Sequence, residues 1–138
     1  METELVDLVW QRAQSFCEYC QLPQTCSQLT FEIDHIIACK HDGITQRGKL
    51  ALSCFYCNSF KGSNIAGFDP LTGKMNRLFH PRRHAWHRHF IWDGPILSGR
   101  TAIGRTTVKV LLINLDLRVA HRLALIEADL FPPAELRE

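Results

Sequence analysis

The chain has 138 residues, of which 46% are hydrophobic and 22% charged, and its formal net charge is +2. These values favour one globular domain with its own core and exclude a fibrous or disordered chain. Polar side chains interrupt even the apolar stretch 108–117, so no membrane span is expected. Residues 1–4 lack the basic start and apolar run of a secretory signal, which predicts a cytoplasmic protein.

The N-terminal part is predicted to form one helix followed by two strands. Apolar residues recur at helical spacing from Thr3 to Ser15, and Thr3 is expected to cap this helix. Residues 29–37 are rich in branched and aromatic side chains, which predicts a strand. The polar segment 40–48 contains two glycines and predicts a loop, after which residues 50–52 are expected to form a second short strand.

A short helix is expected from Cys54 to Lys61, directly after the second strand. Ser53 can cap its beginning, and Gly62 can end it. The order of strand, loop, strand and helix is therefore the predicted core of an α+β fold.

The C-terminal part is predicted to contain turns, a hairpin and two helices. Turns are expected at 67–73, and Asp93-Gly94 between two apolar segments is a hairpin signal. Apolar residues at helical spacing predict helices at 108–115 and 119–126, and Asp116 is expected to cap the second.

Four of the six cysteines form two Cys-x-x-Cys pairs, which are Cys17 with Cys20 and Cys54 with Cys57. Each pair adjoins a predicted turn, so both sulfurs of a pair can point at one metal, and two pairs complete a tetrahedral Zn²⁺ site. Four thiolates leave no open position, so this zinc is expected to be structural and to contribute to folding. Two alternatives are independent core cysteines or a thiol redox pair. Cys26 and Cys39 are expected to be small buried residues.

An Asp-His dipeptide, Asp34-His35, lies in the first predicted strand. Neighbouring strand residues point to opposite sides, so these two are poorly placed to bind one metal together but can flank a phosphate. By itself such a dipeptide is more often a satisfied polar pair at a strand end than a catalytic site.

The order of these motifs resembles the HNH endonuclease family. The matching residues are Cys17-x-x-Cys20, Asp34-His35-Ile36-Ile37, Leu50-Ala51-Leu52-Ser53-Cys54-x-x-Cys57-Asn58 and Lys61. Segments 67–73 and 78–82 look like the extension of one bacterial branch of that family. The resemblance implies a single domain over 1–138, with a ββα-metal core and a structural zinc on four cysteines at 17–62. An N-terminal helix precedes this core, and an extension of a hairpin and helices at 63–138 follows it.

The resemblance also implies a metal-dependent hydrolase that cleaves phosphodiester bonds in DNA. His35 would be the general base that takes a proton from water, a role that suits a side chain titrating near neutral pH. Asp34 and Asn58 would bind a catalytic Mg²⁺ or Mn²⁺ through oxygen. The cation would stabilise the departing 3′ oxygen.

One position departs from the family pattern. Lys49 stands just before the second strand, where the family usually has an asparagine that orients the loop carrying the base. Lysine cannot accept a hydrogen bond, although it can contact DNA. The alternative function is therefore a catalytically weak or inactive nucleic-acid-binding module that zinc stabilises. A thiol redox protein using Cys17 and Cys20 is a third hypothesis.

Positive charge is concentrated between residues 77 and 88, which contain four arginines and no acidic residue. Such a patch on a nearly neutral protein indicates contact with a polyanion, and a solvated face is the alternative. The residues expected to contact DNA are Lys49, Lys61, His80, Arg82 and Arg83. Double-stranded DNA is favoured over single strands, and a homodimer or larger assembly stays open. His41 is expected to be an exposed loop residue.

Overall fold

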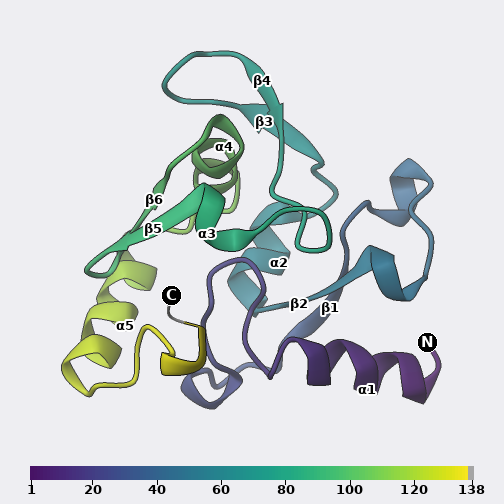
Figure 1. Cartoon of the computed structure of the whole chain (residues 1–138), viewed down its shortest axis with the longest axis horizontal. Helices are drawn as coiled ribbons and strands as arrows, with labels where there is room; N and C mark the ends of the chain where they lie inside the picture. Colours follow the sequence, from purple (N-terminus) through teal and green to yellow (C-terminus); the bar gives the residue numbers. More distant parts are fainter. Residues whose placement is uncertain (137–138) are drawn as a thin grey trace.

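The computed structural model describes residues 1–136 as a mixed α+β fold (Figure 1). The elements are α1 (Thr3–Arg12), β1 (Glu32–His35), β2 (Leu50–Ser53), α2 (Phe55–Lys61), β3 (Ala66–Phe68), β4 (Met75–Arg77), α3 (Trp86–His89), β5 (Phe90–Asp93), β6 (Ile96–Gly99), α4 (Ala102–Val110) and α5 (Asp116–Glu127). Within the described residues, the strands form antiparallel pairs β1–β2, β3–β4 and β5–β6. None of the helices in this part is long and apolar enough to span a membrane.

The predicted strand–loop–strand–helix core is confirmed. Strands β1 and β2 pair in the register Asp34 with Ala51 and His35 with Leu50, and α2 follows β2 after one residue. The first strand is shorter than the predicted 29–37. The Ser27 and Gln24 side chains bond the backbone of Leu29, so these groups cannot also pair with a neighbouring strand.

All three expected helix caps are wrong by one position. The N-cap residues are Glu2, Cys54 and Leu115, so Thr3 and Asp116 already lie inside their helices and Ser53 is the last residue of β2. Helix α1 also ends at Arg12 rather than at Ser15. Gln14 and Ser15 have φ values of 53° and 60°, which lie in the left-handed region and cannot continue a right-handed helix.

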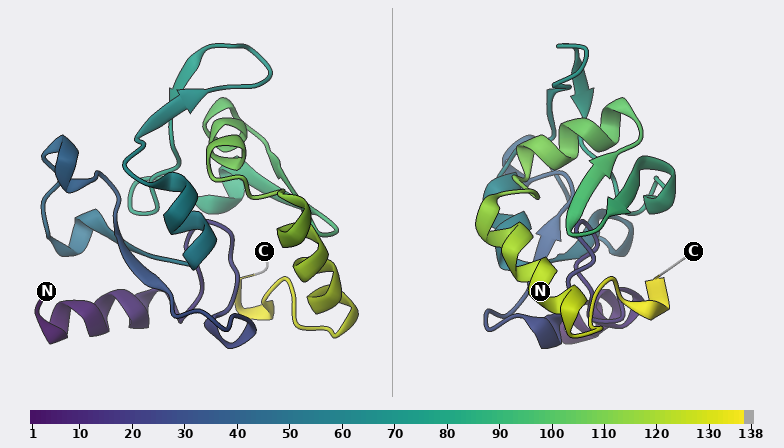
Figure 2. Two further views of the ribbon diagram at one scale, coloured as in Figure 1. Left: turned by 180° about the vertical axis from the view of Figure 1, so that it is seen from behind. Right: turned by 90° about the vertical axis from the view of Figure 1, so that its left-hand side faces the viewer.

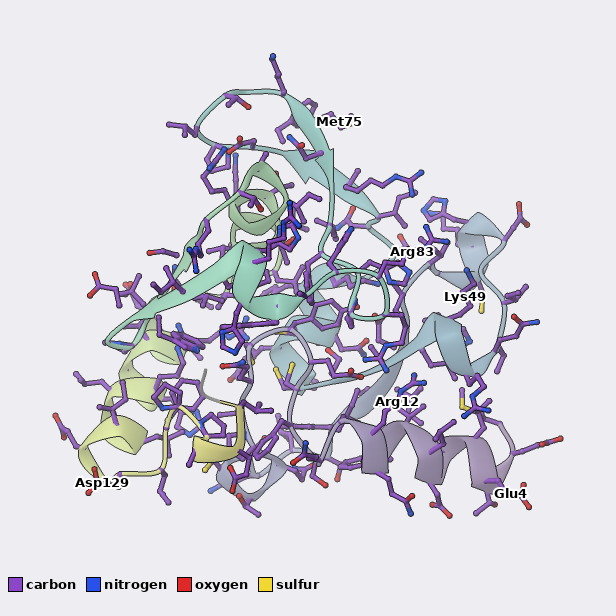
Figure 3. All side chains as sticks on the ribbon, in the orientation of Figure 1. Glu4, Arg12, Lys49, Met75, Arg83 and Asp129 are labelled. Carbon is purple, nitrogen blue, oxygen red and sulfur yellow. The ribbon has the colours of Figure 1, made fainter. Side chains whose placement is uncertain are left out.

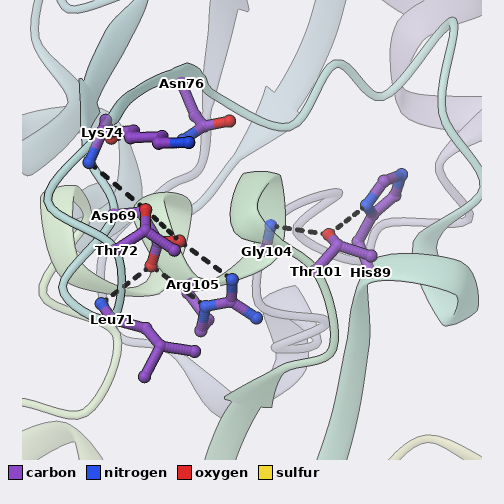
Figure 4. A network of polar contacts seen from close by, with 9 residues as sticks. All are labelled: Asp69, Leu71, Thr72, Lys74, Asn76, His89, Thr101, Gly104 and Arg105. Carbon is purple, nitrogen blue, oxygen red and sulfur yellow. Dashed lines mark hydrogen bonds and ion pairs between the residues drawn. The ribbon is translucent and has the colours of Figure 1, made fainter.

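The turns expected at 67–73 are the tip of a hairpin, β3–β4, which projects from the molecule in every view (Figures 1 and 2). We call this hairpin, residues 66–77, the finger. A Cβ atom at Gly67 would lie 2.5 Å from Cγ2 of Val110, so glycine is needed for the finger to pack on α4. Asp69 receives two hydrogen bonds from Arg105 of α4, at 3.0 and 2.9 Å, and holds Leu71 and Thr72 in the turn (Figure 4).

The predicted hairpin around Asp93-Gly94 is confirmed as β5–β6, and α5 contains the predicted helix 119–126. The expected helix at 108–115 instead begins at Ala102 and ends at Val110. The buried residues of this helix are Gly104, Thr106 and Thr107. A side chain at position 104 would clash with the His89 carbonyl, so glycine is needed there. A buried face of small and polar residues gives no apolar periodicity, which is why the sequence predicts the wrong first residue for this helix.

One hydrophobic cluster joins the two parts of the chain. It contains Val9 of α1 and Leu52 of β2 together with Phe90 of β5 and Leu111 after α4, all at most 1% exposed. Figure 2 shows α1 and α5 at opposite ends of the long axis with α2 between them. The HNH-like core and the extension are therefore packed together through shared side chains.

Candidate functional site

The four paired cysteines form a buried metal-binding cluster. The Sγ atoms of Cys17, Cys20, Cys54 and Cys57 all lie within 4.8 Å of one another. The Cys20 and Cys54 sulfurs are 3.7 Å apart, which matches the edge of about 3.8 Å of a zinc tetrahedron with Zn–S bonds of about 2.3 Å. Backbone N–H groups of Cys20 and Cys57 donate to the sulfurs of Cys17 and Cys54. The donor set and its spacing fit Zn²⁺.

The other two cysteines lie outside this cluster. Cys26 is half-buried and Cys39 is exposed, so the expectation that both are buried is wrong. Cys39 begins a single helical turn in the surface loop between β1 and β2, where no core surrounds it.

Arg118 of α5 gives an independent indication that the cluster carries negative charge. Its side chain is buried, and Nη2 donates to Cys57 Sγ at 3.0 Å while Nη1 donates to the Leu111 carbonyl at 2.8 Å. Burial acts to lower the pKa of Arg118, but the charges of Cys57 and its partner thiolates outweigh burial and raise this pKa. A buried guanidinium needs an anionic partner, and thiolates held by a metal supply one.

Without a metal, Cys17 and Cys57 do not reach this charge state by themselves, whereas hydrogen bonds with the neighbouring cysteines lower the pKa of Cys20. Burial raises the pKa of the Cys17 and Cys57 thiols, which favours their protonated forms. A bound cation removes these protons and leaves thiolates for Arg118 to neutralise.

Asp34 lies on the buried side of β1, where each carboxylate oxygen already has a partner. The Tyr19 hydroxyl donates to Oδ2 at 2.6 Å, and the Lys61 ammonium donates to Oδ1 at 3.1 Å. Burial raises the pKa of Asp34, while the charge of Lys61 and the bond from Tyr19 oppose that rise. Lys61 is 1% exposed and also bonds the His35 carbonyl, at 3.2 Å. The Lys61 ammonium holds β1 to α2 through these contacts, which does not support its expected contact with a DNA phosphate.

His35 points to the opposite side of β1 and is partly exposed. Its Nε2 lies 2.9 Å from the hydroxyl oxygen of Thr45. Gly43 brings this loop close, because a Cβ there would lie 1.7 Å from the Ile37 carbonyl oxygen. Thr45 is a residue that the sequence did not point to, since nothing in the loop's spacing marks one hydroxyl over another.

Lys49 and Asn58 lie on the two segments that flank β2. The carbonyl of Lys49 accepts the Ile36 N–H at 3.0 Å, so the loop is tied to β1 by backbone at the position where the family has asparagine. Asn58 lies half-buried on α2, one turn before Lys61. Within residues 1–136, no hydrogen bond links the Asn58 side chain to Asp34 or to another group.

Only some of the residues expected to contact DNA in the basic segment lie close together. Arg82 forms an ion pair with Glu18, whose carboxylate also accepts the Leu52 N–H. Burial, and then the charge of Arg12, lowers the pKa of Arg82 to about 10. Arg82 is thus engaged in holding the extension to the core, which does not support its expected contact with DNA.

His80 and Arg83 instead line a cleft of about 630 Å³, together with Lys49. This cleft lies between the end of β1 and the finger. Its full lining is Ile36, Ile37, Lys49, Lys61, Ile65, Ala66, Met75, Asn76, Arg77, Leu78, Phe79, His80, Arg83 and His84. No acidic residue belongs to this lining, so the cleft is suited to an anion.

Comparison with known proteins identifies the core of the chain. Residues 17–64 match the family model described as HNH endonuclease. The matched segment runs from the first cysteine of the cluster through Asp34, His35 and α2. No significant match to a curated protein or to a solved structure was found.

Proposed function

Residues 17–64 match the family model of HNH endonucleases, and from this match we propose that the protein is a metal-dependent DNA endonuclease. The observation that carries the proposal is the position of His35. Its imidazole is partly exposed at the end of β1, and the two residues that follow it, Ile36 and Ile37, line a cleft that contains Lys49 and Arg83 and no acid. A partly exposed histidine close in sequence to a cationic cleft fits hydrolysis of a phosphodiester by a general base.

In this proposal His35 removes the proton from the attacking water. In the neutral tautomer whose Nε2–H donates to the Thr45 hydroxyl, Nδ1 is unprotonated and able to accept a proton. The same contact fixes the orientation of the ring, in the way that a second residue orients the base of other hydrolytic sites.

Asp34 and Asn58 are the proposed ligands of a catalytic divalent cation, Mg²⁺ or Mn²⁺, and their oxygens suit such an ion. When bound, the cation supplies positive charge for the departing 3′ oxygen. The Lys61 ammonium now lies against Oδ1 of Asp34, so a cation and Lys61 compete for this carboxylate. The zinc of the cysteine cluster has a separate, structural role, because four thiolates leave it no open position.

Double-stranded DNA is the proposed substrate, with Lys49, His80 and Arg83 against its phosphates. The test is cleavage of supercoiled plasmid by the zinc-loaded protein with Mg²⁺, with Mn²⁺ and without added divalent cation. We expect nicked circles only with the cation. Asn58→Ala should raise the Mg²⁺ concentration needed for half-maximal nicking, whereas Asn64→Ala, a change at an exposed asparagine outside the cleft, should leave it unaltered.

A second candidate is a zinc-stabilised DNA-binding module without activity. Two observations favour it, namely Lys49 at the usual asparagine position and the full set of partners around Asp34. This candidate predicts that folded, zinc-loaded protein binds DNA but leaves plasmid intact with every divalent cation. Nicking that depends on Mg²⁺ or Mn²⁺ would exclude it.

A further inference from the structure

The lining of the cleft contains two kinds of side chain, which we call the cationic wall and the apolar wall. One wall is cationic and contains Lys49, Arg83, His80 and His84. Lys49 and Arg83 come from separate parts of the chain and lie on the same side of the molecule (Figure 3). The apolar wall consists of Met75 in the finger, Ile65 and Leu78 directly before and after the finger, and Ile36 and Ile37, which directly follow His35.

The two histidines of the cationic wall are held as hydrogen-bond donors. Nδ1 of His80 accepts the Arg82 N–H at 3.2 Å, and Nδ1 of His84 accepts the His80 N–H at 2.9 Å. A nitrogen that accepts a bond carries no proton, so each neutral ring carries its proton on Nε2. Within residues 1–136 neither Nε2 has a hydrogen-bond partner, and both rings line the cleft.

The positively charged side chains of the cationic wall repel one another. Burial, together with the positive charges of Arg83, His84 and Lys49, lowers the pKa of His80 to about 4. No carboxylate lines the cleft to offset these charges. A cluster of cations and N–H donors without a protein anion fits the oxygens of a phosphate group.

The apolar wall is not explained by contact with a phosphate. Ile65 is 40% exposed and Met75 66% exposed, and both line the cleft from the side of the finger. A stacked duplex presents phosphates and sugars to a concave surface, whereas a base must leave the stack to reach an apolar pocket. The volume of about 630 Å³ is within the range of small-ligand pockets, so one nucleotide fits.

We propose that this cleft binds one unstacked nucleotide of the DNA strand, with its phosphate at Lys49, Arg83, His80 and His84 and its base against Ile65 and Met75. This inference rests on the proposed function, because it places DNA at the domain, and it adds a preference for bases that are not paired. Extruding a base from an intact duplex costs a few kcal/mol, and a mismatched or open site avoids much of this cost. The protein should therefore bind DNA with an unpaired segment more tightly than perfect duplex.

The experiment measures fluorescence anisotropy of a labelled DNA duplex with the zinc-loaded protein and without added divalent cation. One duplex is fully paired, and the other has a central bubble of three mismatched pairs. We expect the bubble to bind at least about fivefold more tightly, equal to about 1 kcal/mol. Ile65→Ala with Met75→Ala should remove this preference. Phe68→Ala with Leu71→Ala is the matched control, because both residues are exposed on the finger and neither lines the cleft.

The phosphate part of the proposal has its own pair of variants. Arg83→Ala should weaken both duplexes about tenfold and reduce the dependence of affinity on salt, whereas Arg88→Ala, an exposed arginine outside the cleft, should change little. Equal affinity for bubble and duplex, or a bubble preference that survives loss of Ile65 and Met75, would overturn the inference. Plasmid nicking that continues in that case leaves the proposed function intact. A preference for the bubble in the absence of nicking would support the nucleotide-binding cleft and contradict the proposed nuclease activity.

Discussion

Nη2 of Arg118 lies 3.0 Å from the Sγ of Cys57, so a helix of the C-terminal extension contacts the cysteine cluster of the HNH-like core directly. The same side chain donates to the Leu111 carbonyl after α4. One arginine therefore links the cysteine cluster, the end of α4 and α5. Loss of zinc should loosen the extension as well as the core.

Arg118→Met should release zinc faster and lower the free energy of unfolding by about 3 kcal/mol, because it removes one partner of a buried charge pair. The measurements are transfer of zinc to a chromophoric chelator and urea unfolding. Arg88→Met provides the control, since Arg88 is exposed and does not contact the cysteine cluster. Unchanged zinc release in Arg118→Met would show that this arginine does not neutralise the thiolates.

Lys61→Met should destabilise the protein by about 3 kcal/mol, because Asp34 then keeps its buried charge without a cation. Asp34→Asn in the same chain should recover part of the loss, so a double-mutant cycle over the two positions measures their coupling. If the proposed cation site is correct, Lys61→Met should also lower the Mg²⁺ concentration needed for nicking. Additive effects of the two substitutions on unfolding would contradict the pairing.

The sequence predicts the functional core well because its signals are local. Two Cys-x-x-Cys pairs, the Asp-His dipeptide and a short helix after a strand fix the order of the ββα core without knowledge of the extension. The direction of side chains was harder to predict. Spacing suggested that Lys61 faces DNA, but the burial of Asp34 makes an ionic partner necessary, and Lys61 is the side chain within reach.

Two parts of the site depend on contacts between distant segments. The finger was missed because its strands contain three residues each, which is too short for a period-2 pattern to be read. Arg118 was missed because an arginine in an amphipathic helix normally faces water, and only the packing of α5 on the cluster shows otherwise. Neither relationship follows from local pattern.

Thr45→Val should reduce nicking about tenfold while leaving unfolding unchanged, because the residue orients His35 rather than packing the core. Thr45→Ser should retain most activity, since the hydroxyl stays. The pH profile of the rate separates this role from a structural one, because a changed orientation of the base alters the profile whereas a loss of stability does not. Thr30→Val is the control at another exposed threonine. Full activity with an unaltered profile in Thr45→Val argues against an orienting role.

Stability should fall as pH decreases from 7 to 5. The pKa of His80 is lowered to about 4 by burial and by the charges of Arg83, His84 and Lys49, whereas an unfolded histidine titrates near 6.5. Between these values the unfolded chain binds a proton that the folded chain does not, so acid favours unfolding.

His80→Asn should therefore reduce the slope of unfolding free energy against pH by about 1 kcal/mol per pH unit below pH 6. Asparagine keeps an oxygen that can accept the Arg82 N–H. Urea unfolding at several pH values measures the slope. His41→Asn, in an exposed loop, is the control, and equal slopes in all three proteins would mean that His80 is not the group responsible.

The central claim is that His35 is the base of a nuclease, and the most direct test compares plasmid nicking by wild type, His35→Ala and His41→Ala. All three proteins are zinc-loaded, checked for folding by circular dichroism and assayed with Mg²⁺ and Mn²⁺. We predict that His35→Ala lowers the nicking rate at least about a hundredfold while His41→Ala keeps it. Nicking by folded His35→Ala at the rate of wild type would contradict the account.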